Sequence, residues 1–480
     1  MSRFLDFFKA SAPSAEKTAP EKIEKQYKRQ RFQAFFAGTI GYSLYYVCRT
    51  SLNVVKGGIL EDGILTASQL GTIGSCLFFA YAVGKFVNGF LCDYSNIKKF
   101  MATGLIISAL ANFMMGALGL FAGGAGTAAA AGSAALFISF AIIWGLNGWS
   151  QSMGAPSAIV GLSRWYPLKV RGTYYGFFSA SHNFGEWLSY LFVGLLVSMA
   201  GWKWGFFGAS LAGVLGIILI LFWLHDNPES KGLPPVEVLS GEKTQEQYEA
   251  DKLAAVPSDQ EKAAAKNETS RIQRAVLRNP GVWILALASA FMYMSRYAIN
   301  SWGILFLEKI KGFSTVEAST IISVNAICGV VGTVFSGWFS DVVFHGDRKY
   351  PAFVAGVLEA ISLALFLFGG NSWFINITAM ILFGIAIGVL ISFIGGLMAI
   401  DIVPRKATGA ALGIVGMASY AAAGIQDIIS GLLIDNMAAK DAAGNIVSYD
   451  FTYASWFWLL AAVISFMLPV LNWRRKQADI

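Results

Sequence analysis

Charged side chains are scarce in this chain of 480 residues, and many of them are confined to two stretches. Only 14% of the residues are charged, against about 25% in a typical soluble domain. Residues 1–31 hold 12 charged residues and residues 225–280 hold 18, so the other 393 positions carry 35. The hydrophobic fraction is 55%. This composition excludes a soluble enzyme, a disordered protein and a disulfide scaffold, and it indicates a polytopic α-helical membrane protein.

Cysteine and histidine are also rare, with four and three residues. The cysteines form no CxxC pair and the histidines are scattered, so we expect no disulfide and no metal site. The sequence has no Walker A motif, no nucleotide fingerprint and no catalytic triad, so we expect neither a cofactor nor an enzyme. The net charge of +7 follows from lysine and arginine placed beside a membrane, and it requires no nucleic acid partner.

Long apolar runs recur along the chain and predict twelve helices, each close to the roughly 20 residues that span a bilayer. The predicted ranges are 32–54, 68–91, 99–121, 134–159, 172–199, 202–224, 281–307, 316–340, 351–369, 373–398, 407–433 and 451–473. The segment 225–280 is rich in proline and in charges of both signs, which is typical of a linker. We therefore expect two six-helix halves, 32–224 and 281–473, with tails at 1–31 and 474–480.

Basic residues alternate between the two sides of this predicted bundle. One side receives the basic tails and the basic links that follow predicted helices 2, 4, 8 and 10. The other side receives few lysines, namely Lys56, Lys203, Lys309, Lys311 and Lys440. The positive-inside rule then places both termini and the 225–280 linker in the cytoplasm. We expect the protein to lie in the inner membrane of the cell. Asp6 and Lys9 interrupt the early apolar stretch, so we expect an uncleaved first helix.

The two halves repeat each other. Gly84-x4-Gly89-x3-Asp93 recurs as Gly332-x4-Gly337-x3-Asp341 at an offset of 248, and Arg49 and Arg296 are 247 apart. Matches in the same order indicate a duplicated bundle. Two parallel six-helix halves are the architecture expected for the major facilitator superfamily, with a site at the midplane. Asp93 and Asp341 end their helices and are interpreted as gating or packing residues.

Arg49 and Arg296 lie deep in predicted helices 1 and 7. An arginine at mid-bilayer costs at least about 2.5 kcal/mol, so each needs a cavity or a partner. Neither helix interior carries a carboxylate that would neutralise them. Guanidinium groups match phosphate oxygens bidentately, so two of them facing one cavity suit a dianionic phosphate. The alternative is a purely structural role, in which each arginine forms a salt bridge with a residue of another helix or extends its charged end to the membrane surface.

Two such unpaired cations also predict a transport mode. In an empty cavity they would repel each other and resist closure, whereas a bound phosphate would neutralise them. The loaded protein would then turn over and the empty one would turn over poorly, which gives one-for-one exchange.

Further side chains are candidates for a second tier of contacts. Tyr42, Tyr45 and Tyr46 share a helix face with Arg49, so their hydroxyls either bond the substrate or pack as an aromatic stripe. Lys85 is a third cation without a nearby acid. The remaining candidates are His182, Asn183, Tyr420 and Asp427. His182 is either a phosphate contact or a core histidine bonded to Glu186, and Asp427 either pairs with a cation or forms an interhelical bond.

The motifs around these residues resemble the organophosphate:phosphate antiporters of the major facilitator superfamily. They are Tyr45-Tyr46-x2-Arg49, Tyr81-Ala82-Val83-Gly84-Lys85-Phe86, Gly148-Trp149-x-Gln151-x-Met153-Gly154, Arg171-Gly172-x5-Phe178-x2-Ser181-His182-Asn183-x-Gly185 and Ser295-Arg296-Tyr297. The resemblance implies that Arg49 and Arg296 bind phosphate, that His182 lies beside them, and that Lys85 is a secondary contact. Two residues depart from the family's pattern. Glu186 stands where relatives usually carry a glycine, and Thr50 stands where many relatives carry a lysine.

The stretches Arg49–Asn53 and Asn279–Leu285 look closer to the hexose-phosphate members. The resemblance thus implies an antiporter that exchanges a sugar phosphate, such as glucose 6-phosphate, for inorganic phosphate by rocking of its halves. We expect it to function as a monomer. A receptor that senses hexose phosphate for a partner histidine kinase and a glycerol-3-phosphate antiporter stay open. A proton-coupled sugar porter is disfavoured, because the centres of helices 1 and 7 carry arginines and no acid.

Overall fold

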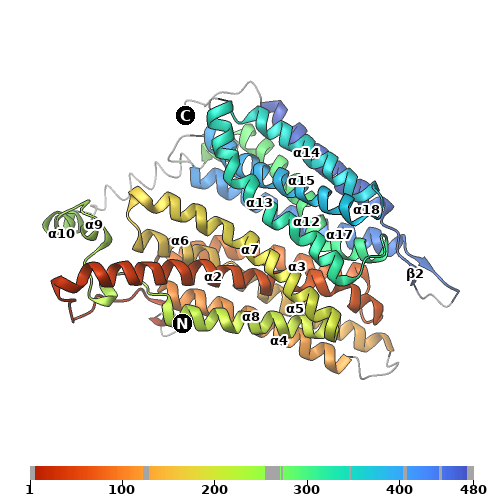
Figure 1. Cartoon of the computed structure of the whole chain (residues 1–480), viewed down its shortest axis with the longest axis horizontal. Coiled ribbons are helices and arrows are strands. Elements are labelled where there is room, and N and C mark those ends of the chain that lie inside the picture. Colours follow the sequence, from red (N-terminus) through yellow and green to blue (C-terminus); the bar gives the residue numbers. More distant parts are fainter. Residues whose placement is uncertain are drawn as a thin grey trace.

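The computed structural model describes residues 6–122, 129–254, 271, 274–344, 347–403, 408–442 and 446–472. These residues are nearly all helical, and Figure 1 shows the helices of residues 20–223 on one side of the molecule and those of residues 280–472 on the other. We call the end that holds residues 6–19 and the 225–254 segment the tail end, and the opposite end the far end.

The first half contains six helical units in chain order. They are α2 (Pro20–Glu61), α3 (Ala67–Asp93), α4 (Ile97–Ala122), α5 (Ala129–Gln151) followed by α6 (Gly154–Trp165), α7 (Leu168–Ala200) and α8 (Trp202–Trp223). Short elements follow at the tail end: η1 (Glu229–Lys231), α9 (Val236–Leu239) and α10 (Gln245–Ala254).

The second half repeats this arrangement. Its units are α12 (Pro280–Lys309), α13 (Thr315–Val343), α14 (Lys349–Phe368), α15 (Trp373–Ser392) with η2 (Phe393–Leu397) and α16 (Met398–Asp401), α17 (Thr408–Asn436), and α18 (Thr452–Met467) with η4 (Leu468–Asn472). A small antiparallel hairpin of β1 (Ala439–Lys440) and β2 (Ile446–Ser448) joins α17 to α18.

Two of the predicted helices, the first and the fourth, differ most from the structure. The first begins at Pro20 and not at 32, because the polar stretch before the membrane is also helical. The predicted helix 134–159 is interrupted between α5 and α6. Pro156 explains where the second piece can begin, since it falls in the first turn of α6, where a missing N–H removes no intrahelical hydrogen bond.

The second helix of each half starts with the same capping box. Thr66 accepts from the backbone of Gln69, whose side chain accepts from the backbone of Thr66. Ser314 and Glu317 do the same at the start of α13. Each box satisfies helix-end N–H groups that would otherwise lack a partner. Local sequence therefore fixes these two helix starts in equivalent places.

Contacts between the halves gather toward the far end. Ser68 Oγ donates to Asp435 at 2.8 Å, and Lys309 Nζ lies 2.5 Å from Glu61. Helices α3 and α17 approach closely there, because a Cβ on Gly71 would lie 2.3 Å from the Asp427 carbonyl. Toward the tail end, a Cβ on Gly176 or Gly413 would meet nothing within 4 Å. The halves are thus in contact at the far end, whereas space remains beside these two glycines toward the tail end.

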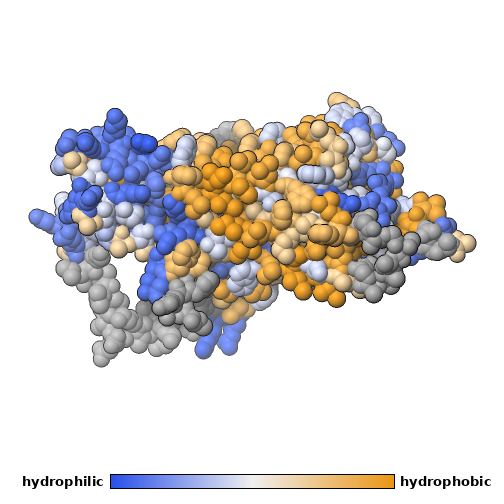
Figure 2. All heavy atoms as spheres, turned by 90° about the horizontal axis from the view of Figure 1, so that it is seen from below, coloured by the Kyte–Doolittle hydropathy of each residue, from blue (hydrophilic) through white to orange (hydrophobic). Residues whose placement is uncertain are grey.

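Figure 2 shows an apolar surface over the middle of the molecule and hydrophilic surface mostly toward its ends. Exposed apolar side chains of the middle include Leu110, Phe113, Leu211, Leu215 and Ile361. Within the described residues, nine helices are long and apolar enough to cross a membrane. An apolar belt of this kind is what lipid tails require of a helical protein.

The orientation of the bundle is a prediction that thiol labelling tests. A cysteine at Trp204, at the far end, is expected to react with a membrane-impermeant reagent in intact cells, because the positive-inside rule places this end outside. A cysteine at the exposed Glu242, in the 225–254 segment, is the control and should react only after the cells are opened. Labelling of Glu242→Cys in intact cells would reverse the orientation.

Candidate functional site

Arg49 lies in the middle of α2 and is only 5% exposed. Its guanidinium faces three aromatic rings, those of Tyr46 at 5.2 Å, Tyr81 at 4.3 Å and Tyr420 at 5.5 Å from ring centroid to Cζ. Ring faces stabilise a cation without using its N–H donors. Among the described residues, Nη2 of Arg49 has no hydrogen-bond partner. The side chain therefore keeps a donor free for an anion.

Arg296 lies in α12 of the other half and is 6% exposed. Its Cζ is 5.3 Å from the ring of Tyr297 and 5.9 Å from that of Tyr293. Unlike Arg49, it has a carboxylate partner: its Nη2 lies 3.6 Å from Oε2 of Glu186, on α7 of the first half. The prediction of two unpaired cations is therefore wrong for Arg296, because the partner comes from a different helix.

A cluster of tyrosines connects the two arginines. The ring of Tyr420 lies 4.6 Å from Tyr81, 5.5 Å from Tyr293 and 6.4 Å from Tyr297. Nζ of the exposed Lys85 is 5.3 Å from the same Tyr420 ring. The structure thus brings Arg49, Arg296, Lys85 and Tyr420 to one place between the halves. Tyr46, Tyr81, Tyr293, Tyr297 and Tyr420 are called the tyrosine cluster below.

His182 and Asn183 lie beside this cluster. The ring of His182 is 5.7 Å from that of Tyr46, and the Tyr46 ring also faces Arg49. Asn183 is buried and faces α13, where its Oδ1 is 3.6 Å from the position of a Cβ on Gly329. Glu186 bonds across to Asn300 of α12. The histidine is therefore well placed for a role at the site.

His182 is predicted to hydrogen-bond the phosphate through its imidazole. His182→Leu removes both ring nitrogens, so it should weaken phosphate binding by about fivefold at a fixed pH, because a neutral hydrogen bond contributes about 1 kcal/mol. Calorimetry on the purified proteins measures the change. Unchanged affinity would make His182 a packing residue.

Tyr42 and Tyr45 have different surroundings although they share a helix with Arg49. The ring of Tyr42 lies 5.5 Å from Tyr46 and 5.2 Å from Phe178, at the edge of the cluster. Tyr45 is fully buried within the first half, and its hydroxyl donates to the carbonyl of Met101 at 2.5 Å. The structure does not bring Tyr45 to the tyrosine cluster, and the packing interpretation fits it better.

Asp93 and Asp341 were interpreted as gating or packing residues. Asp93 is exposed at the end of α3, and its carbonyl accepts from Nη2 of Arg164 at 3.0 Å. That contact lies inside the first half and does not reach the second. The side chain of Asp341 lies outside the described part of the structure.

Asp427 belongs to a separate buried group nearer the far end. Its Oδ1 lies 3.5 Å from Nζ of Lys56 and accepts from Ser301 at 2.6 Å. Lys56 also donates to Ser301 at 2.7 Å and stands 3.7 Å over the ring of Trp302. The charge pattern predicts Lys56 in an outer link, and this prediction is wrong, because Lys56 is fully buried in α2. Lys56, Ser301, Trp302 and Asp427 form the far-end ion pair group.

Several residues of these groups were not selected from the sequence. Tyr293 lies one turn before Arg296 and Asn300 one turn after it, and Lys56 follows Arg49 by seven residues on the same face. Tyr297 directly follows Arg296 and lies one turn after Tyr293. This periodicity was a usable signal. It could not reveal which facing helix supplies each partner, because partners lie on helices far apart in the chain.

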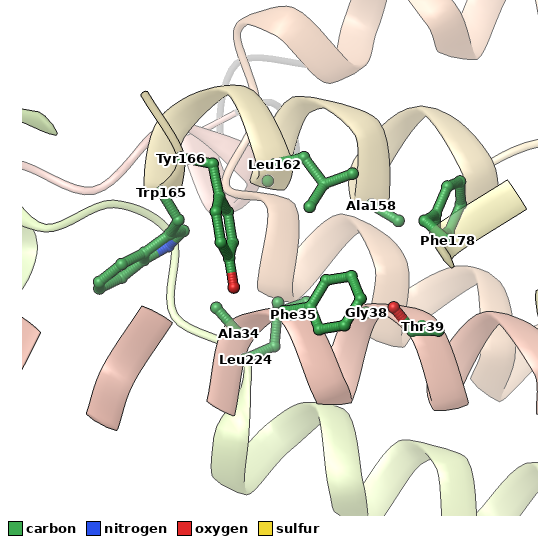
Figure 3. A pocket seen from close by; sticks show the side chains of 11 residues that line it. Ala34, Phe35, Gly38, Thr39, Ala158, Leu162, Trp165, Tyr166, Phe178 and Leu224 are labelled. Carbon is green, nitrogen blue, oxygen red and sulfur yellow. The ribbon is translucent and has the colours of Figure 1, made fainter. Parts of the chain in front are cut away.

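A pocket in the first half is unrelated to this site. Figure 3 shows it between α2, α6 and α7, lined by the apolar and aromatic side chains of Ala34, Phe35, Leu162, Tyr166 and Phe178. Its volume is about 10 Å³, which leaves room for roughly one water molecule. It has no cationic lining residue. It is too small and too apolar for a phosphate ester.

Comparison with known proteins gives the family. The model of the Major Facilitator Superfamily matches residues 38–426. A crystal structure of a bacterial homologue of the human lysosomal transporter Spinster, in an inward-facing and occupied conformation, superimposes with a TM-score of 0.69 at 16% identity, covering 96% of this chain and all of that one. At this identity the likeness concerns the fold alone.

Relatives narrow the assignment. A probable hexose phosphate transport protein of Chlamydia pneumoniae is 32% identical, over 88% of this chain and 89% of its own. The membrane sensor protein UhpC of Salmonella typhimurium is 30% identical over 88% and 89%, and a glycerol-3-phosphate transporter of Bacillus subtilis is 31% identical over 90% and 92%. The chain is therefore a multi-pass membrane protein, not an enzyme, and it belongs to the organophosphate:phosphate antiporter group of the Major Facilitator Superfamily, with its twelve-helix fold.

Proposed function

We propose that this protein exchanges a hexose phosphate, such as glucose 6-phosphate, for inorganic phosphate across a bacterial inner membrane. The observation that carries the proposal is the pair of buried arginines from opposite halves around one tyrosine cluster. Arg49 keeps an unpartnered donor, Nη2, among the described residues. The name of the Chlamydia pneumoniae relative supports the hexose phosphate as substrate.

The phosphate group would bind between Arg49 and Arg296. Guanidinium forks give phosphate oxygens two parallel hydrogen bonds each, and such charge-assisted bonds are the strong ones. Lys85 and His182 would add a further cation and a further donor or acceptor at the edge of the cluster. Because one arginine belongs to each half, a bound phosphate would draw the halves together.

The contacts at the far end and the space toward the tail end give a starting state for this cycle. Under the predicted orientation, the tail end faces the cytoplasm, so the structure would correspond to an inward-facing state. Rocking of the halves would open the far-end seam at Ser68–Asp435 and Glu61–Lys309 and close the tail end. Substrate would thereby reach the same site from either side.

Exchange in vesicles tests the proposal. Purified protein is reconstituted with internal phosphate, and uptake of labelled phosphate is measured against a panel of competing hexose phosphates and glycerol 3-phosphate. We expect glucose 6-phosphate to compete best. Stronger competition by glycerol 3-phosphate would show that this smaller ester, and not a hexose phosphate, is the preferred substrate. Binding without flux would instead favour a receptor, and the Salmonella typhimurium relative is named a membrane sensor protein. For such a receptor we propose a histidine kinase as the partner.

A further inference from the structure

Glu186 provides a negative charge between the halves at the proposed phosphate site. We propose that this carboxylate replaces phosphate as the counter-ion of Arg296 when the site is empty, so that the protein also carries out net transport without a counter-substrate. The inference rests on the proposed function, because it concerns the same site. It adds a second transport mode to exchange.

The contacts of Glu186 link the two halves. Its side chain is 2% exposed, and its Oε2 lies 3.6 Å from Nη2 of Arg296. Its Oε1 accepts from the side chain of Asn300 at 2.6 Å and from the hydroxyl of Tyr190 at 3.4 Å. Tyr190, on α7 like Glu186, also donates to the carbonyl of Asn300 at 3.0 Å. Helices α7 and α12 are thus held together at the site by contacts that require no phosphate.

The net charge at the site decides how hard it is to close without substrate. Arg49 and Arg296 alone would leave a charge of +2 in an empty site, and a phosphate dianion would reduce it to zero. Repulsion between like charges is strong where water is scarce, so only the loaded form would close readily. With an ionised Glu186, the empty site carries +1 and the loaded site −1. Empty and loaded forms then differ little in the magnitude of their charge.

Lys85 and His182 do not change this comparison between the charge of the empty site and that of the loaded site. Lys85 is exposed, so water and salt screen its charge more than they screen the buried groups. His182 contributes equally to empty and loaded forms if its charge is unchanged. The buried charges of Arg49, Arg296 and Glu186 therefore set the difference between the two forms.

The same geometry makes Glu186 a competitor of the substrate. Its Oε2 accepts no hydrogen bond from the described residues, although it is buried beside Arg296. A phosphate that bonds Arg296 with two parallel hydrogen bonds must displace this carboxylate or lie against it. Removal of the charge should therefore tighten phosphate binding while it slows the return of the empty protein.

The experiment compares wild type with Glu186→Gln and Glu186→Asp in vesicles. The initial rate of labelled phosphate uptake is measured in phosphate-free vesicles and in phosphate-loaded vesicles. The readout is the rate in phosphate-free vesicles divided by the rate in phosphate-loaded ones. We expect measurable uptake into phosphate-free vesicles for wild type. Glu186→Gln keeps the shape and loses the charge, so its ratio should fall at least about tenfold, the effect of roughly 1.4 kcal/mol. Glu186→Asp keeps the charge and should stay close to the wild-type ratio.

A second variant and a second measurement keep the inference open to refutation. Asn300→Ala removes a neutral hydrogen-bond donor to Glu186 without changing its charge, so its ratio should stay close to that of wild type. Calorimetry on the purified proteins should show tighter binding of inorganic phosphate to Glu186→Gln than to wild type. An unchanged ratio in Glu186→Gln, or no uptake by wild type into phosphate-free vesicles, would overturn the inference about Glu186. Uptake into phosphate-loaded vesicles would still support the proposed function. Absence of uptake into loaded vesicles would overturn the proposed function, and unchanged phosphate affinity would then remove Glu186 from the site as well.

Discussion

Replacing Arg49 or Arg296 by lysine is expected to lower phosphate exchange in vesicles by about 10- to 100-fold. Lysine keeps the positive charge but loses the planar fork, so one of two parallel charge-assisted hydrogen bonds disappears, each worth about 1.5–3 kcal/mol. Arg49→Lys also loses the flat stacking surface that the rings of Tyr46, Tyr81 and Tyr420 face. The measurement is the initial rate of labelled phosphate uptake into phosphate-loaded vesicles.

The chain contains a matched control for this substitution. Arg31, on the same helix as Arg49, also stands over two tyrosine rings, those of Tyr27 at 5.0 Å and Tyr166 at 5.2 Å, but at the tail end. Arg31→Lys should leave exchange within about twofold, because surface changes away from a site have small effects. Wild-type exchange in both Arg49→Lys and Arg296→Lys would refute the assignment of these side chains as the phosphate clamp.

Removing the carboxylate of Asp427 is expected to shift the conformational equilibrium toward the state that is open at the far end. Asp427→Ala leaves the ammonium of Lys56 buried without its ion-pair partner, which costs about 3–5 kcal/mol for groups of this kind. The pair joins α2 of the first half to α17 of the second, so the cost falls mainly on the state with a closed far end. Ser301 and Trp302 alone cannot replace the lost charge.

Thiol labelling at the far-end seam measures this shift. In a background without native cysteines, Ser68→Cys, which faces Asp435 in the closed seam, should label at least about tenfold faster when combined with Asp427→Ala. The double replacement Lys56→Met with Asp427→Leu removes both charges and should restore slow labelling. Asp251→Ala, which breaks the exposed pair with Lys243, is the surface control and should change nothing. Equal labelling in the presence and absence of Asp427→Ala would show that this pair does not hold the seam.

The revised view of Arg296 changes the expected transport mode. Repulsion between two unpaired arginines predicts one-for-one exchange, with poor turnover of the empty protein. Because Glu186 pairs with Arg296, Arg49 is the one of these two arginines that has no carboxylate partner among the described residues. Exchange and net transport therefore become properties that a single substitution at Glu186 should separate.

Much of this molecule follows from local sequence. Apolar runs of about 20 residues must become helices in lipid, because no other backbone partner is available there. The capping boxes at Thr66 and Ser314 start equivalent helices, since the N-cap and the third helical residue satisfy each other's backbone. Arg49 and Arg296 stood out because a buried cation in an apolar helix is costly and therefore rarely incidental.

The tertiary structure decided which groups meet. Lys56 follows Arg49 by two helical turns, and periodicity alone was compatible with an exposed lysine in an outer link. Burial against Trp302 and pairing with Asp427 depend on how α2, α12 and α17 pack. In the same way, the sequence marked Glu186 as a departure from related proteins, but only the packing of α7 on α12 places it beside Arg296. Residues that pair across the halves are far apart in the chain, as Glu186 and Asn300 are by 114 positions, so only the packed structure determines their distance.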